Sequence, residues 1–311
     1  MTGFVIRKLL RTLFTLFLVV TFVFFVLRLT GDPVSAMMPD DTDPAILDEL
    51  RKQWGLDRPL GVQYLEYWFN LLQGDFGNAY RDGRPAIEIV AERVPATLKL
   101  TLTAFAFIVI AGFPLGIFAA VNRGTAIDRG IMTISVTGFS LPNFFLGILL
   151  IFLLSVTLRW LPAYGSDHWY NLIMPVITLG TAGAAVIARF VRSSMLEVLN
   201  APYIRACRAR GMTERAIIWT VALPNAAIPT ITIMGFMVGT LIGGSIVTET
   251  VFAWPGIGRL LIDAVTAREL AVVQTVVMIT AASMVFANLA VDLLYLVIDP
   301  RRRYASGTGE G

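Results

Sequence analysis

The sequence predicts an all-α membrane protein with six transmembrane helices and both chain termini in the cytoplasm. Three observations lead to this fold class. The 311 residues are 56% hydrophobic and 15% charged, with a mean hydropathy of +0.71, whereas soluble proteins are about 25% charged. Six long windows lack charged residues and histidine, and arginine and lysine gather in the segments that join them on one side. A soluble enzyme, a disordered chain and a fibrous chain are therefore excluded.

The six windows are residues 12–27, 100–122, 130–158, 169–188, 216–248 and 270–291. A span of about 20 apolar residues crosses a hydrocarbon core of about 30 Å. The first window is short, but Arg28 can extend it by placing its charged end at the interface. The fifth window is too long for one span and contains Pro224 and Pro229. We therefore expect its membrane helix to begin near Asn225, with residues 216–222 outside the bilayer.

The distribution of basic residues predicts the orientation of the chain. With a cytoplasmic N-terminus, 13 arginines and lysines lie inside, and the two short outer loops carry 3. The inner set is Arg7, Lys8, Arg11, Arg123, Arg129, Arg192, Arg205, Arg208, Arg210, Arg215, Arg301, Arg302 and Arg303, and the outer set is Arg159, Arg259 and Arg268. Cytoplasmic loops are enriched in such residues. The formal charge of +3 therefore reflects topology, and we expect no nucleic-acid partner.

The first window also resembles a signal peptide, because residues 34–36 read like a cleavage site. Its uncharged run of 16 residues exceeds the usual signal core, so we expect an uncleaved anchor. The chain then divides into residues 1–29 with the first helix, an extracytoplasmic segment 30–99, a five-helix core 100–300 and a cytoplasmic tail 301–311. The core includes a cytoplasmic loop at 193–224 and an outer loop at 249–270.

The extracytoplasmic segment 30–99 contains two predicted helices. Asp43 or Thr42 can cap a helix that begins at Pro44 and ends near Gly55. A second, amphipathic stretch places five apolar residues on one face, which suits the membrane surface; they are Val62, Leu65, Trp68, Phe69 and Leu72. The segment serves either as a cap over the outer helix ends or as a surface for a partner.

Several kinds of chemistry are absent from the sequence. His168 and Cys207 are the single histidine and cysteine, so no His-rich or multi-cysteine metal site can form in one chain. None of the three lysines follows a glycine, which excludes a P-loop for ATP. Charged residues lie only near the ends of the windows, which disfavours an ion-coupled carrier and a selective channel. The helical bundle therefore needs an external energy source.

The basic segment between the fourth and fifth windows predicts a helix–turn–helix at the cytoplasmic surface. Pro202 suits the first turn of a helix that runs to Arg210. Gly211 suits a left-handed cap, and Thr213 caps a second short helix, which we expect Pro224 to interrupt before the next span.

This segment resembles the EAA loop of ATP-binding-cassette importer permeases, whose pattern is E-A-A, three residues, G, nine residues, I-x-L-P. Here the triplet is Arg205-Ala206-Cys207, the glycine is Gly211, and the ending is Val221-Ala222-Leu223-Pro224. The resemblance implies that the loop docks on an ATPase. The residues expected to couple the two proteins are Tyr203, Arg205, Ala206, Cys207, Arg208, Gly211, Met212, Thr213, Glu214, Val221, Leu223 and Pro224. Arg205 replaces the glutamate of the general pattern.

Other stretches look like the B-type subunit of the dipeptide/oligopeptide permease family. They include residues 74–77, 93–97, 140–147, 160–162, 252–259 and 292–301. The resemblance implies a type I ABC importer permease fold in a bacterial inner membrane. It also implies four partners: a second, C-type permease, two cytoplasmic ATPase subunits that hold ATP and Mg, and an extracytoplasmic solute-binding protein. No cofactor is expected in this chain, and ATP hydrolysis is expected in the partners.

The outer loop 249–270 has its own pattern. Trp254-Pro255-Gly256 forces a turn, and residues 257–267 read as a short amphipathic helix. A rigid loop that presents aromatic groups outward suits a docking partner, which the resemblance identifies as the binding protein. The expected contacts are Glu249, Phe252, Trp254, Pro255, Gly256 and Arg259. A re-entrant plug is the alternative.

The function that the resemblance implies is half of a translocation pathway for dipeptides or oligopeptides. Glutathione, a nickel chelate or an oligosaccharide are alternative substrates of the same machinery, and a membrane-embedded enzyme and a scaffold subunit without transport are alternatives of other classes. Pathway residues are expected on the third and fifth spans, at Asn143, Met234, Met237 and Gly239. The glycines of the fifth span equally suit close helix packing.

Overall fold

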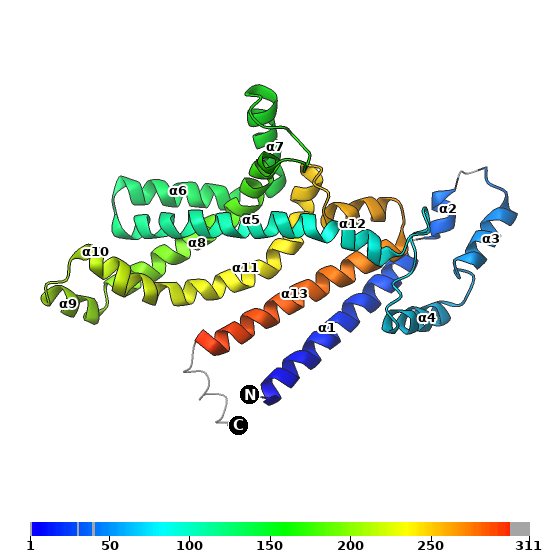
Figure 1. The fold of residues 1–311 in the computed structure, drawn as a ribbon, viewed down its shortest axis with the longest axis horizontal. Coiled ribbons are helices and arrows are strands. Elements are labelled where there is room, and N and C mark those ends of the chain that lie inside the picture. The colour runs from blue at the N-terminus through cyan, green and yellow to red at the C-terminus, as the bar shows by residue number, and fades with distance from the viewer. Residues whose placement is uncertain (1, 30, 39–40, 299–311) are drawn as a thin grey trace. The chain divides into compact units, whose positions relative to one another are not determined.

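The computed structural model describes residues 2–29, 31–38 and 41–298. These residues form helices joined by turns, with one isolated bridge between Asn78 and Pro85 and no strand in the part described (Figure 1). The chain divides into two compact units, residues 1–96 with 255–283 (unit 1) and residues 97–254 with 284–311 (unit 2). The expected cytoplasmic tail, with Arg301, Arg302 and Arg303, lies outside the described residues.

Five described helices contain a stretch that is long and apolar enough to span a membrane. They are α1 (Thr2–Leu29), α5 (Ala86–Val121), α8 (Ile173–Leu199), α11 (Leu223–Val251) and α13 (Leu270–Ile298). Each contains or overlaps one of the predicted windows. The prediction of an all-α membrane protein is therefore confirmed.

The third predicted window, 130–158, is not one helix. It consists of α6 (Ala126–Ser140), followed by α7 (Asn143–Leu150), which continues as the π-helix η1 (Ile151–Thr157), and the two parts meet at an angle of 104°. Leu141 is extended, with φ −76° and ψ 125°, because the ring of Pro142 disfavours helical backbone in the residue before it. The described helices therefore provide six spans only if this bent pair counts as one.

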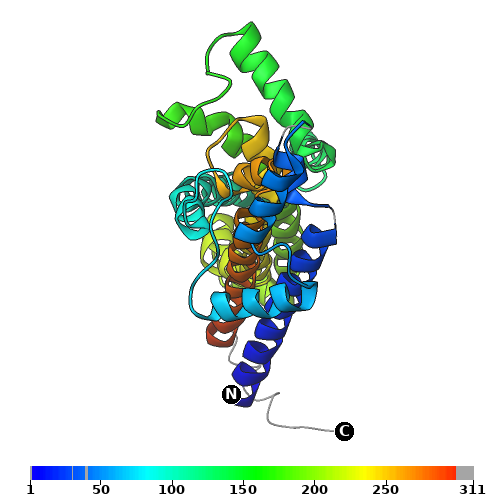
Figure 2. The same cartoon turned by 90° about the vertical axis from the view of Figure 1, so that its right-hand side faces the viewer.

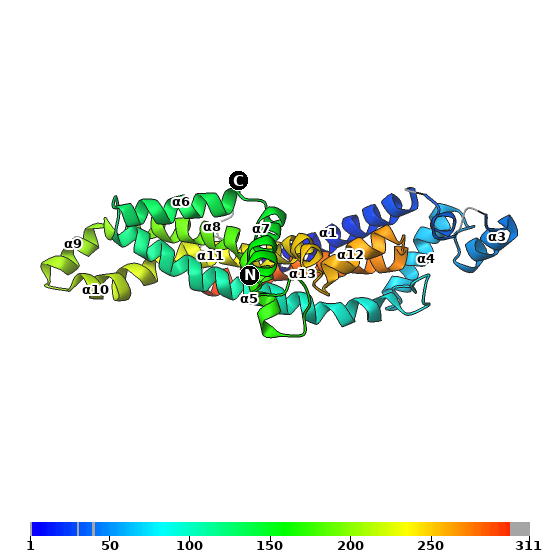
Figure 3. The same cartoon turned by 90° about the horizontal axis from the view of Figure 1, so that it is seen from above.

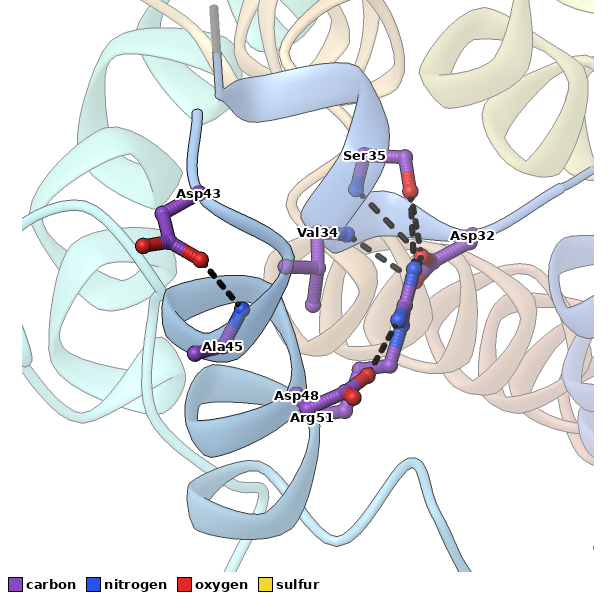
Figure 4. Close-up of polar contacts among 7 residues, drawn as sticks. All are labelled: Asp32, Val34, Ser35, Asp43, Ala45, Asp48 and Arg51. Carbon is purple, nitrogen blue, oxygen red and sulfur yellow. Dashed lines mark hydrogen bonds and ion pairs between the residues drawn. The ribbon is translucent and has the colours of Figure 1, made fainter. Parts of the chain in front are cut away.

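In unit 1, polar contacts join the short helices α2 (Pro33–Met37) and α3 (Pro44–Gln53), as Figure 4 shows. Oδ1 of Asp43 accepts a hydrogen bond from the Ala45 N–H at 2.9 Å, so Asp43, rather than Thr42, caps α3. Asp32 caps α2 and accepts from Arg51 Nη2 at 2.8 Å. Burial alone would raise the pKa of Asp32, but hydrogen bonds from Ser35, Arg51 and the Val34 N–H hold it below its ordinary value.

Helix α4 (Leu60–Leu72) packs its aromatic side chains on α1, which Figure 2 shows in blue beside it. Trp68 stacks on Phe17 with ring centroids 5.3 Å apart, and Tyr64 contacts Phe24. Leu65 remains 69% exposed. The expected single apolar face is therefore divided: Trp68 faces α1, and the exposed part consists of Leu60, Val62, Leu65, Phe69 and Leu72.

In unit 2, α8 packs against both α6 and α11, and Figure 3 shows the three helices side by side. Glycines bring α5 against α8. A Cβ at Gly116 would lie 2.6 Å from the carbonyl oxygen of Ala188, and one at Gly112 would lie 3.0 Å from that of Ala184. The two backbones approach this closely because neither glycine carries a side chain.

The orientation of the chain can be tested by cysteine labelling in a Cys207→Ser background, which removes the one native thiol. The exposed Asp57 belongs to the segment predicted outside, and the exposed Asn200, at the C-terminal end of α8, lies on the predicted inner side. We expect Asp57→Cys to react with an impermeant maleimide in intact spheroplasts, and Asn200→Cys to react only after lysis. The reverse pattern would contradict the orientation.

Candidate functional site

The predicted helix–turn–helix is present where α8 ends and α11 begins in the chain (Figures 1 and 3). Helix α9 (Pro202–Ala209) starts at Pro202. Proline lacks a backbone N–H, which costs nothing here because N–H groups in the first turn of a helix have no carbonyl partner within the helix. Helix α10 (Glu214–Ala216) starts after Thr213, whose Oγ1 accepts from the Ala216 N–H at 3.3 Å. Both helix starts were predicted from the sequence.

The turn between α9 and α10 is a Schellman motif centred on Gly211. Gly211 has φ +82° and donates to the Arg208 carbonyl at 2.9 Å, while the Met212 N–H donates to the Cys207 carbonyl at 3.2 Å. This pair of bonds satisfies the last carbonyls of α9. The left-handed conformation predicted for Gly211 is confirmed.

An ion pair that the sequence pattern did not predict crosses this turn. Arg208 donates from Nε to Oε1 of Glu214 at 2.6 Å and from Nη2 to Oε2 at 3.2 Å. The hydrogen bond from Arg208 lowers the pKa of Glu214. Because both side chains are substantially exposed, the pair contributes little to the stability of the protein.

The loop is anchored on one side and exposed on the other. Ile204 of α9 and Ile217 are fully buried, and α9 contacts the π-helix η3 (Ile217–Ala222). Tyr203 is 44% and Trp219 is 55% exposed. Arg205, Ala206, Arg208, Gly211, Thr213 and Glu214 are also exposed, whereas Cys207, Met212, Val221 and Leu223 are half-buried. The exposed side of the loop therefore carries two aromatic side chains, Tyr203 and Trp219, and its other side is anchored by the buried Ile204 and Ile217.

The expected break at Pro224 is wrong. Residues 214–251 are helical without interruption, through α10, η3 and α11. The π-helical turn lies directly before Pro224, and the Leu223 N–H donates to the carbonyl of Ile218, five residues back. Such a wider turn accommodates proline where a regular α-helix would be strained. The loop thus continues directly into the membrane helix.

The outer loop 249–270 differs from the expectation of outward aromatic groups. Phe252 and Trp254 are each 1% exposed, and Glu249 is fully buried. Thr97 donates to Oε1 of Glu249 at 2.7 Å. The predicted turn and helix are present, because α12 (Ile257–Thr266) follows Gly256.

Of the predicted binding-protein contacts, Pro255 and Arg259 are half-buried, and Gly256 is buried. The exposed residues of this loop are instead Ile262, Asp263, Val265 and Thr266 of α12, together with Thr250 and Arg268 on either side of that helix.

The predicted pathway residues are not gathered into a described cavity. Asn143 begins α7, and Met234, Met237 and Gly239 lie on α11, which contacts both α7 and α8. A Cβ at Gly183 of α8 would lie 2.8 Å from Cε of Met237, so this methionine packs into helix–helix contact. A Cβ at Gly243 would have no neighbour within 4 Å; close packing within this chain therefore does not explain that glycine.

Sequence reasoning also missed a buried ion pair between α6 and α8. Arg192 donates from Nε to Oδ1 of Asp128 at 2.6 Å and from Nη2 to Oδ2 at 2.8 Å. The Gly124 N–H donates to Oδ2 as well, at 2.9 Å. The sequence assigned Arg192 only to topology, and 64 residues separate it from Asp128, so no local spacing pointed to the pair.

Residues 112–304 match the model of a protein family described as "Binding-protein-dependent transport system inner membrane component", and residues 1–101 match the model of the corresponding N-terminal region. The chain is 45% identical over 305 residues to the "Glutathione transport system permease protein GsiC" of Escherichia coli (strain K12). It has the same identity to the protein of that name from Salmonella typhi. Both alignments cover 98% of this chain and 100% of the relative.

Solved structures of the "MetNI methionine ABC transporter" in inward-facing conformations share the fold. The native crystal form aligns with a TM-score of 0.57 at 24% identity and covers 68% of this chain and 97% of the other. A second form, from a SeMet soak, aligns with a TM-score of 0.59 at 24% identity, with coverage of 68% and 96%.

Proposed function

Since the chain belongs to the family of binding-protein-dependent transport system inner membrane components, we propose that its α9–α10 loop couples peptide import to ATP hydrolysis in partner subunits. The chain is a permease subunit of a bacterial ABC importer of the inner membrane. The observation that supports the coupling role is the Schellman turn at Gly211, which holds α9 and α10 in a fixed arrangement at the spacing of the EAA loop. The exposed Tyr203 and Trp219 are suited to a groove on the ATPase.

The partners proposed are a second, C-type permease, two ATP-binding-cassette ATPases and an extracytoplasmic solute-binding protein. The outer loop contributes to binding-protein contact through the exposed side of α12 and Arg259, because Phe252 and Trp254 are buried. The proposed substrates are short peptides. Glutathione, itself a tripeptide, is the first candidate, since relatives with 45% identity over their full length carry the name of a glutathione transport system.

The purified chain alone is expected to hydrolyse no ATP, because none of its lysines follows a glycine and a P-loop is missing. The assembled complex with both ATPases, in nanodiscs, is expected to hydrolyse ATP faster when a peptide-loaded binding protein is added. Release of phosphate from ATP is measured for both samples. ATP turnover by the isolated chain would contradict the first expectation, and a complex indifferent to the loaded binding protein would contradict the importer role.

A further inference from the structure

Unit 1 contains a cavity of about 470 Å³ at the C-terminal end of α1. Its walls come from Arg28 of α1, from α4, from the turns at 53–55 and 75–83, and from Gln274 in α13. By the predicted topology the cavity lies on the outer side of the membrane. Its volume falls within the range of about 300–1,000 Å³ that is typical of small-molecule sites.

The guanidinium of Arg28 is held in place by Gln63, which is 7% exposed. Nε2 of Gln63 donates to the carbonyls of Arg58, at 2.7 Å, and Leu56, at 3.3 Å. Those two bonds turn the amide oxygen of Gln63 towards Arg28, whose Nε donates to it at 2.6 Å. The arginine is thus positioned by a side chain that is itself fully hydrogen-bonded.

Two nitrogen donors in the cavity wall lack an acceptor within the described residues. They are Nη1 of Arg28 and Nε2 of Gln274, and the Gln274 side chain is 7% exposed. A buried donor without a partner is costly, and such groups in proteins call for an explanation. Oxygen acceptors of a bound molecule in the cavity, reached by rotation of the side-chain ends, would satisfy these nitrogens. An anionic oxygen suits the guanidinium best.

The remaining wall is aromatic and acidic. Trp54 stacks on Tyr80 with ring centroids 4.1 Å apart, and burial raises the pKa of Tyr80 as well as that of Tyr67, the latter to about 12. Both phenols are therefore neutral. The carboxylate of Asp75, which also lines the cavity, has no ion-pair partner in the described part of the chain. Its charge favours a cationic group and disfavours a phosphate.

We propose that this cavity binds a short zwitterionic peptide, with the peptide carboxylate at Arg28 and Gln274 and its ammonium group towards Asp75. The site would hold substrate on the outer face of the permease itself, in addition to the binding protein. This proposal rests on the proposed function, because it requires peptide to reach this face of the chain.

The test measures binding of radiolabelled alanyl-alanine to the assembled permease–ATPase complex in nanodiscs, without binding protein. We expect saturable binding, with alanyl-alanine amide and inorganic phosphate competing at least about tenfold less well. Absence of saturable binding, in a complex whose ATPase still responds to the loaded binding protein, would overturn the site and leave the proposed function intact. Equal competition by the amide or by phosphate would also overturn it.

Variants locate the binding. Arg28→Gln is expected to weaken alanyl-alanine affinity about tenfold or more, and Gln274→Leu about threefold or more, since each removes a donor. The matched control is Arg93→Gln, which removes an exposed charge of α5 that does not line the cavity, and it should leave the affinity unchanged. If Arg28→Gln fails to assemble, Gln274→Leu decides: wild-type affinity in that variant would overturn the proposal.

Discussion

Gly211→Val is expected to abolish most substrate uptake while the protein remains folded and inserted. Gly211 has φ +82°, and a Cβ built there would meet nothing within 4 Å, so the effect arises from the backbone alone. Valine in this region is strained by about 1–3 kcal/mol, and the strain is relieved by opening the turn between α9 and α10. An open turn misdirects the loop. If docking on the ATPase becomes less favourable by the same free energy, about 1–3 kcal/mol, affinity for the ATPase falls about 5- to 150-fold.

Two measurements on the assembled complex check this: the amount of ATPase that co-purifies and the rate of peptide uptake. The matched control is Gly74→Val, because Gly74 has φ +83° and an equally open Cβ position but lies in the segment predicted outside. We expect Gly74→Val to impose similar backbone strain but to leave the amount of co-purified ATPase unchanged. Gly211→Asn is expected to be milder than valine, since asparagine tolerates left-handed backbone. Normal uptake and normal ATPase content in Gly211→Val would show that the loop does not couple the subunits.

Asp128→Ala is expected to produce a large loss of stability. It removes the carboxylate that binds Arg192 through two hydrogen bonds, of 2.6 and 2.8 Å, and leaves that guanidinium without its counter-ion. The side chain of Asp128 is 5% and that of Arg192 28% exposed. Removing one partner of a buried pair costs about 3–5 kcal/mol, and the partial exposure of Arg192 points to the lower end, about 3 kcal/mol.

Unfolding of the purified chain in mixed detergent micelles measures this cost. The comparison variant is Glu92→Ala, which breaks the exposed pair of Arg84 and Glu92 and should leave unfolding unchanged within error. The double variant Asp128→Ala with Arg192→Met should recover most of the loss, because it removes the unpaired charge as well. A single variant as stable as wild type would show that the pair does not hold α6 to α8.

Local signals in the sequence predicted the local features of this structure. Asp43 before Pro44, Thr213 before α10, and Gly211 at a helix end each act through hydrogen bonds or backbone sterics within a few residues, so spacing along the chain is enough to identify them. The uncharged windows likewise predicted the membrane helices, because lipid imposes the same requirement on every span.

The wrong predictions concern features that depend on the surroundings of a residue. We predicted a break at Pro224 because proline interrupts a regular α-helix, but the π-helical turn of η3 directly before it allows the helix to continue. Phe252 and Trp254 were expected to face outward because they lie in a short loop, yet both are buried. The contact of Asp128 with Arg192 joins two helices, and a single sequence carries no signal for such a contact.

The glycines that bring α5 against α8 restrict how the permease can move. With the backbones in contact at Gly112 and Gly116, sliding one helix along the other by a turn would drive side chains into carbonyl groups. We therefore expect these two helices to move together during a transport cycle. We expect the displacement to be taken up elsewhere, at the bend between α6 and α7 where Leu141 precedes Pro142. A cross-link between α5 and α8 should thus leave transport intact, whereas one across the bend between α6 and α7 should stop it.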